Sequence, residues 1–118
     1  MMKEKLVETI VEAISDKKGQ NTITLDLSGI DGAITGAFVI CSADSTTQVA
    51  AIADGIEDKV RRELGDKPWR VEGLTNSVWV AMDYVDVVVH IFLKELRGFY
   101  KLEELWADAP AIRYEQQQ

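Results

Sequence analysis

Several residue types are scarce in this 118-residue chain, and each scarcity excludes a class of protein. The chain has one cysteine, Cys41, and one histidine, His90, far apart in the sequence. A zinc site needs several cysteines or histidines at short spacings, so no zinc site is predicted. A lone cysteine forms no internal disulfide, and we therefore expect a cytoplasmic protein.

The chain also lacks long apolar runs and an excess of basic residues. No run approaches the roughly 18–20 apolar residues that a membrane-spanning helix needs. The first residues do not combine a basic stretch with an apolar one, and we expect no secretory signal. The chain has 13 Lys and Arg against 20 Asp and Glu, a net charge of −7. This balance argues against non-specific nucleic-acid binding and favours a basic or uncharged partner.

What the chain does have is the length and hydrophobic content, 47%, of one globular domain. Spacing of apolar residues predicts helices and strands. The expected helices span residues 3–16, 45–64 and about 96–106. The expected strands span residues 22–27, 37–41, 69–72, 78–84 and 86–93. This order predicts an α/β sandwich with a mixed sheet of about five strands and flanking helices.

Local signals refine this outline. Ser45 and Gln48 have the spacing of a capping box, which predicts where the long helix begins. The last two strands are nearly contiguous, so they should form an antiparallel hairpin that turns near Tyr84 and Val85. We expect residues 1–110 to form the domain and the polar residues 111–118 to fray as a tail.

Enzyme sites find little support in the sequence. The turn before the long helix has no Gly or Lys, so no phosphate-binding loop is predicted there. Asp83 and Asp86 are the one nearby pair of carboxylates that a tight turn could bring onto a magnesium ion. The alternative is that these two residues bracket the hairpin and accept hydrogen bonds in the turn.

Two side chains near the hairpin allow both a packing and a binding role. His90 lies in an apolar strand without a Ser or Cys nucleophile beside it, which is typical of a packed histidine or of an interaction surface. Trp79 alternates with the core positions of its strand, so it lies either under a helix or at an interface. The sequence leaves both alternatives open.

The segment from Val71 to Leu93 stands out because it contains no Lys or Arg. It carries the acids Glu72, Asp83 and Asp86 together with three aromatic residues. Aromatic and charged residues together are typical of protein interfaces. An acidic surface of this kind suits a basic protein partner.

The second half of the chain also follows the pattern of a known family. The residues that match in order are Glu72-Gly73, Trp79, the run from Asp83 to Phe92, Arg97, Tyr100, Leu102-Glu103, Leu105-Trp106 and Asp108-Ala109. On these residues the chain resembles the ribosomal silencing factor, or iojap, family. The resemblance covers residues 4–109, nearly the whole chain.

The resemblance implies a nucleotidyltransferase-like α/β fold without transferase activity or cofactor. It implies a translational repressor that binds the large ribosomal subunit through ribosomal large-subunit protein fourteen. Occupying the face where the small subunit docks would block subunit joining when nutrients are scarce. Family members are often dimeric when isolated, which makes a homodimer a candidate state. The composition argues against a membrane partner and against direct nucleic-acid readout. The competing hypothesis is a divergent magnesium-dependent nucleotidyltransferase that uses Asp83 and Asp86.

The partner-binding residues implied by the resemblance are Trp79, Asp83, Tyr84, Asp86, His90, Arg97, Tyr100 and Glu103. Trp79 and Tyr84 would be apolar anchors. Asp83, Asp86 and Glu103 would pair with Lys or Arg of the ribosomal protein. No catalytic, cofactor-binding or metal-binding residues are implied.

The remaining matched residues divide between contact and support. Arg97 would pair with an acid of the partner or hold the last helix in place. Tyr100 would add packing and a hydroxyl contact. Leu105 and Trp106 have helical spacing and are expected in the core.

Two positions depart from the family pattern. Gly36-Ala37 stands where an acidic residue and an aromatic are common, so any role of that pair is lost or moved. Val85 stands where the family usually has glycine. Because a β-branched residue resists positive φ, we expect a different turn geometry at Val85.

Overall fold

The computed structural model describes residues 2–33, 35–100 and 109–114 as one α/β domain. Its elements are α1 (Met2–Asp16), β1 (Gln20–Asp26), β2 (Ala37–Ala43), α2 (Thr46–Leu64), β3 (Arg70–Glu72), β4 (Trp79–Asp83), β5 (Val87–Leu93), α3 (Lys94–Tyr100) and β6 (Ala111–Arg113). The six strands form one sheet in the order β3-β4-β5-β2-β1-β6. The β2 and β5 strands run parallel and the other pairs antiparallel. The predicted mixed α/β sandwich is therefore confirmed.

The sixth strand corrects the prediction of a sheet of about five strands with a fraying tail. Residues 111–113 pair antiparallel with β1, and the Tyr114 N–H donates to the Thr22 carbonyl at 2.9 Å. All three residues of β6 are exposed. Because neither face of β6 is buried, its residues do not alternate between apolar and polar, and no strand pattern is visible in the sequence. The strand forms through backbone hydrogen bonds to the edge of β1.

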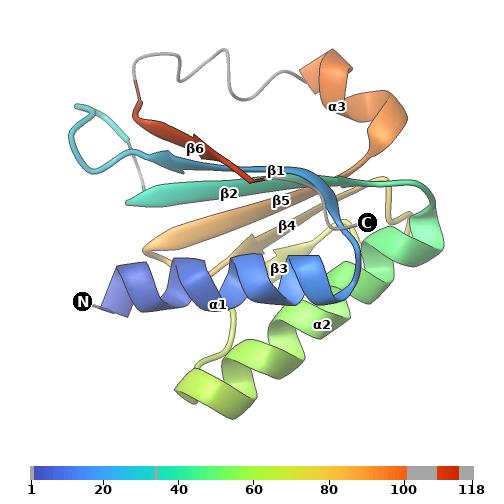
Figure 1. The fold of residues 1–118 in the computed structure, drawn as a ribbon, viewed down its shortest axis with the longest axis horizontal. Coiled ribbons are helices and arrows are strands. Elements are labelled where there is room, and N and C mark those ends of the chain that lie inside the picture. The colour runs from blue at the N-terminus through green and yellow to red at the C-terminus, as the bar shows by residue number, and fades with distance from the viewer. Residues whose placement is uncertain (1, 34, 101–108, 115–118) are drawn as a thin grey trace.

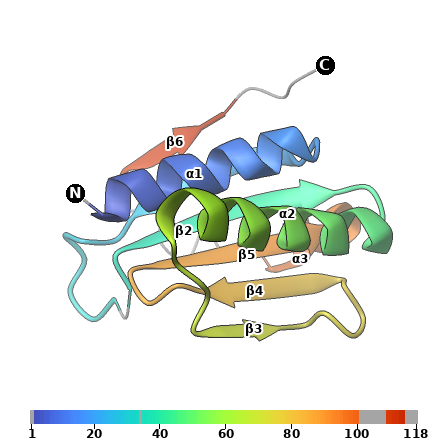
Figure 2. The same cartoon turned by 90° about the horizontal axis from the view of Figure 1, so that it is seen from below.

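The helices are divided between the two faces of the sheet (Figure 1). Helices α1 and α2 lie side by side on one face, whereas α3 lies on the other. Figure 2 shows α1 running over β1 and β2, with α2 toward β5 and β4. We call these the helix-covered face and the opposite face.

A polar connection joins the end of α1 to the start of α2. The Ser45 hydroxyl accepts from the Gln48 N–H at 3.1 Å, as the capping box predicts. The Gln48 side chain accepts from the Asp44 N–H at 2.8 Å, one residue before the position that the motif predicts. Its amide nitrogen donates to the Lys17 and Lys18 carbonyls, so one side chain caps both helices.

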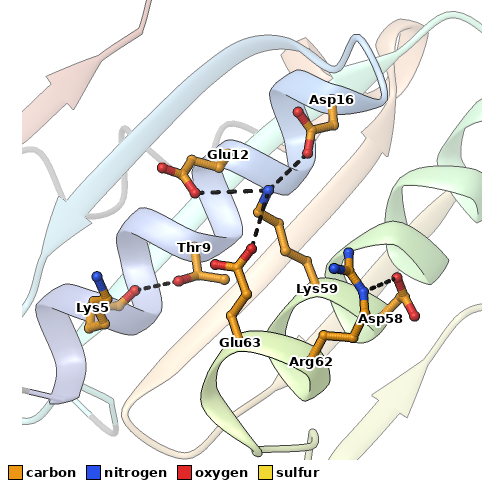
Figure 3. A network of polar contacts seen from close by, with 8 residues as sticks. All are labelled: Lys5, Thr9, Glu12, Asp16, Asp58, Lys59, Arg62 and Glu63. Atoms are coloured by element: carbon orange, nitrogen blue, oxygen red, sulfur yellow. Dashed lines mark hydrogen bonds and ion pairs between the residues drawn. The ribbon is translucent and has the colours of Figure 1, made fainter.

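A second connection between α1 and α2 is ionic (Figure 3). The Lys59 ammonium lies 3.1 Å from the Asp16 carboxylate, 3.6 Å from Glu63 and 3.9 Å from Glu12. Its hydrogen bond to Asp16 is the main reason that the pKa of Lys59 is raised. One cation of α2 therefore pairs with acids from both helices.

Each face of the sheet has its own hydrophobic core. The helix-covered core includes Ile10, Ile52 and Ile91, all fully buried. The core of the opposite face includes Phe38 and Phe92. Every residue of β2 is buried, as predicted for a strand covered on both faces. None of the described helices is long and apolar enough to cross a membrane.

Candidate protein-binding surface

The β4–β5 hairpin presents one side to each core. Val80 and Met82 of β4 point into the helix-covered core. Trp79 and Val88 pack against the core of the opposite face. In the hairpin register Trp79 lies across from Phe92, and Asp83 lies across from Val88. Trp79 and Asp83 therefore belong to the opposite face, at the two ends of β4.

Trp79 is held by an aromatic cluster. Its indole N–H donates to Nδ1 of His90 at 3.1 Å, and its ring stacks on Phe92 with centroids 5.0 Å apart. Phe38 contacts the His90 ring edge to face at 4.8 Å. The indole is half-buried: Trp79 packs against the core of the opposite face and keeps part of its surface exposed, while its predicted interface role stays a prediction.

His90 is a packed residue, as one of its two predicted roles requires. It is 8% exposed, and burial lowers its pKa to about 4. The ring is therefore neutral at pH 7. Since Nδ1 accepts from Trp79, the proton of the neutral ring lies on Nε2. His90 thus fixes the orientation of Trp79 through this hydrogen bond. It offers no positive charge to a partner.

The hairpin turn corrects the prediction for Val85. This residue adopts a φ of 75°, the positive value that a β-branched side chain resists. The Asp83 carboxylate accepts from the Val85 N–H at 2.7 Å, and the Thr35 hydroxyl donates to the Val85 carbonyl at 2.9 Å. These two hydrogen bonds hold the valine in a conformation that glycine would adopt more easily.

The loop with Gly36 and Ala37 docks against the same turn. Both backbone N–H groups donate to the Asp86 carbonyl, at 3.0 and 3.1 Å. A Cβ built on Gly36 would come within 3.1 Å of that carbonyl oxygen. The departure at Gly36-Ala37 therefore coincides with a close backbone contact, which a larger residue at position 36 would disturb.

The two carboxylates of the magnesium hypothesis have different surroundings. Asp83 is half-buried and its Oδ1 accepts from the turn, which is the predicted bracketing role. Asp86 is exposed, and its backbone carbonyl rather than its carboxylate holds the neighbouring loop. Among the described residues no group of three or more acids, histidines or cysteines is placed to hold a metal ion.

Tyr84 lies on the other side of the hairpin from Trp79. It is 5% exposed and belongs to the helix-covered core, where burial raises its pKa. Within the described part of the chain its buried hydroxyl has no hydrogen-bond partner. Tyr84 therefore packs the hairpin against the helix-covered core and does not share a surface with Trp79.

The last helix contributes one described contact near the cluster. The Arg97 guanidinium donates to the Ser42 hydroxyl at 2.8 Å, which fastens α3 to β2. This contact matches the predicted role of holding the last helix. The side chain of Tyr100 and all of Glu103 lie outside the described residues, as do Leu105 and Trp106.

Sequence reasoning missed Trp69 as a surface residue. Its side chain is 69% exposed, and Val85 beside it is 62% exposed. A shallow pocket at this end of the hairpin is lined by Thr35, Trp69, Asp83, Val85 and Val88. The sequence predicts a strand that begins at Trp69, whereas β3 begins one residue later. Its position directly after Pro68, among charged neighbours, was the available signal of exposure.

Comparison with known proteins identifies the family. The family model described as "Ribosomal silencing factor during starvation" matches residues 1–118. The chain belongs to the ribosomal silencing factor family. Members are named for silencing ribosomes, a regulatory role rather than catalysis. The predicted family is confirmed.

Individual relatives agree with this assignment. The ribosomal silencing factor of Halalkalibacterium halodurans is 41% identical over 115 residues, covering 98% of this chain and 97% of that protein. A crystal structure of a Chromobacterium violaceum protein superposes with a TM-score of 0.84 at 30% identity, covering 100% of this chain and 91% of the other. A mouse protein named "Mitochondrial assembly of ribosomal large subunit protein 1" is 33% identical over 75 residues, covering 61% of this chain and 32% of that protein.

Proposed function

We propose that this protein represses translation by binding the large ribosomal subunit and sterically blocking the small subunit from joining it. The proposed contact is ribosomal large-subunit protein fourteen, and the proposed condition is nutrient limitation in the cytoplasm. Membership of the ribosomal silencing factor family carries this proposal. The name of the mouse relative, which refers to the large subunit, supports the choice of subunit.

The charge of the hairpin supports a basic protein as the direct partner. No Lys or Arg occurs between Val71 and Leu93. Among the described residues no ion pair engages Asp83 or Asp86. Asp86 is exposed to cations of a partner, whereas Asp83 is half-buried and its Oδ1 already accepts from the Val85 N–H. Complementary charge of this kind guides association and suppresses wrong partners.

The half-buried indole supports an anchoring role for Trp79. Interface anchors are typically aromatic side chains held rigidly in a packed environment. Trp79 meets this description because His90 and Phe92 fix its orientation before any partner binds. Asp83 and Asp86 would then pair with basic residues around the anchor.

Direct binding tests the proposed partner. Purified chain is titrated into purified large-subunit protein fourteen in a calorimeter, and separately into isolated large and small subunits. We expect saturable binding to the protein and to large subunits, with none to small subunits. Absent binding to large subunits would contradict the proposal, whereas binding to large subunits alone would move the contact to another component.

A further inference from the structure

The end of the β4–β5 hairpin exposes two apolar side chains together. Trp69 is 69% exposed and Val85 is 62% exposed. They line the same shallow pocket, and the Trp69 N–H donates to the Asp83 carbonyl at 2.7 Å, which fixes the tryptophan beside the turn. The Arg70 guanidinium lies 4.9 Å from the Trp69 ring centroid and covers part of it.

The backbone at Val85 is a second and independent observation. Its φ of 75° is a conformation that a β-branched residue adopts only at an energetic cost. This conformation is maintained by the Asp83 carboxylate, which accepts from the Val85 N–H, and by the Thr35 hydroxyl, which donates to the Val85 carbonyl. Strained residues fixed in this way are concentrated at functional sites. Here the strain holds an apolar side chain largely in solvent, where it contributes little burial to the folded chain.

We propose that Trp69 and Val85 form a second apolar docking point for the basic ribosomal protein of the proposed function. The partner residue would be an apolar side chain flanked by Lys or Arg. It would insert between Trp69 and Val85 while its basic neighbours meet the carboxylates of Asp83 and Asp86. This inference rests on the proposed function and extends its contact surface.

Charge and continuity favour this occupant. Asp83 lines the pocket itself, and Asp86 follows Val85 directly and is exposed. Along β4 the docking point lies on the same side of the sheet as Trp79, since Asp83 and Trp79 share the opposite face. The two apolar anchors would thus lie near the two ends of β4 on one face, with Asp83 beside the second anchor and Arg70, its partner in β3, over the Trp69 ring.

Val85 provides a test in which stability and affinity change in opposite directions. Replacing Val85 by Gly relieves the backbone strain but removes the apolar side chain. We expect a higher melting temperature together with about threefold weaker binding to large subunits. Asparagine also tolerates this backbone conformation, so Val85→Asn should likewise raise the melting temperature and weaken binding to large subunits. Trp69→Ala should weaken binding at least about tenfold with little change in melting temperature.

Leu74 offers a matched control because it is also an exposed apolar residue, at 50%, beyond the other end of β3. Leu74→Ser should leave affinity within about twofold of wild type, as expected for a residue outside the contact. Unchanged binding by both Trp69→Ala and Val85→Gly overturns the docking point alone. Absent binding by the wild-type chain overturns the docking point and the proposed function together. If the variants lost self-association but kept their affinity for large subunits, the pocket would bind a second copy of this chain, and the inference would be overturned.

Discussion

The two faces of the sheet use their side chains differently. The helix-covered face is an apolar layer sealed by α1 and α2, and its largest residues are fully buried. The opposite face mixes aromatics with a neutral histidine and carboxylates, and it leaves Trp79 half-buried. Both faces stabilise the fold through a hydrophobic core. The second face carries the groups from which we derive binding, so substitutions on the two faces should separate stability from affinity.

The largest effect is expected on the helix-covered face. Ile52 is fully buried between α2 and the sheet, and Ile52→Ala leaves a cavity there. We expect the free energy of unfolding to fall by about 3 to 4 kcal/mol, measured by urea titration. Binding of the folded fraction to large subunits should be unchanged. A large loss of affinity without loss of stability would contradict the separation of the two faces.

The opposite face should contribute a pH dependence to stability through His90. The unfolded chain binds a proton on this residue near its ordinary pKa of about 6.5, whereas in the folded chain burial lowers the pKa to about 4. The unfolded state therefore holds more protons between these values, so stability falls as the pH decreases from about 6.5 to about 4. The loss attributable to His90 is about 3 kcal/mol.

The comparison variant for that measurement is His90→Gln, which does not titrate and can still accept from Trp79. Its carboxylates titrate like those of the wild type, so the difference between the two unfolding curves isolates the histidine. We expect the stability difference between wild type and variant to change across this pH window and to be constant above pH 7. Parallel pH profiles for the two proteins would contradict a buried neutral His90.

Trp79 should affect binding more than any other single residue of the opposite face. Trp79→Ala removes the proposed anchor, and we expect affinity for large subunits to fall by about 2 kcal/mol, roughly thirtyfold. Trp79→Phe keeps the stacking on Phe92 but loses the hydrogen bond to His90. Its affinity should lie between those of wild type and Trp79→Ala. Full affinity of Trp79→Ala, with reduced stability only, would restrict Trp79 to the core.

The smallest effect is expected for Asp86, whose side chain is exposed. Asp86→Asn should weaken binding to large subunits by about 0.5 kcal/mol, as one ion pair at an exposed rim does. The effect should shrink as salt is added, because exposed charges are screened. Asp31→Asn, an exposed carboxylate outside the hairpin, is the matched control. If both variants weakened binding equally, the affinity would depend on the net charge of the chain and not on the position of Asp86.

The sequence predicted the helix-covered face well because periodicity reports burial. The stripes of α1 and α2, the central strand from Ala37 and the β4–β5 hairpin all follow from apolar spacing. The predicted mixed sheet missed β6, because three exposed residues leave no pattern. A strand that pairs through backbone hydrogen bonds alone leaves no pattern of apolar and polar side chains in the sequence.

The opposite face was predictable in composition but not in geometry. The sequence identified Trp79, His90 and the acidic residues of the hairpin, yet it could not show that Trp79 donates to His90. It named both Trp79 and Tyr84 as apolar anchors, whereas the structure buries Tyr84, directly after β4, in the helix-covered core. Val85 was expected to avoid positive φ, but tertiary hydrogen bonds override the local preference.

Repression by this chain requires that it keep the two ribosomal subunits apart. Purified large and small subunits are mixed at a magnesium concentration that favours joined ribosomes, with increasing amounts of this chain, and separated on a sucrose gradient. We expect the joined peak to decrease as the chain saturates large subunits, and the chain to sediment with free large subunits. We also expect Trp79→Ala to require a much higher concentration for the same effect. An unchanged joined peak at saturating chain would contradict the account.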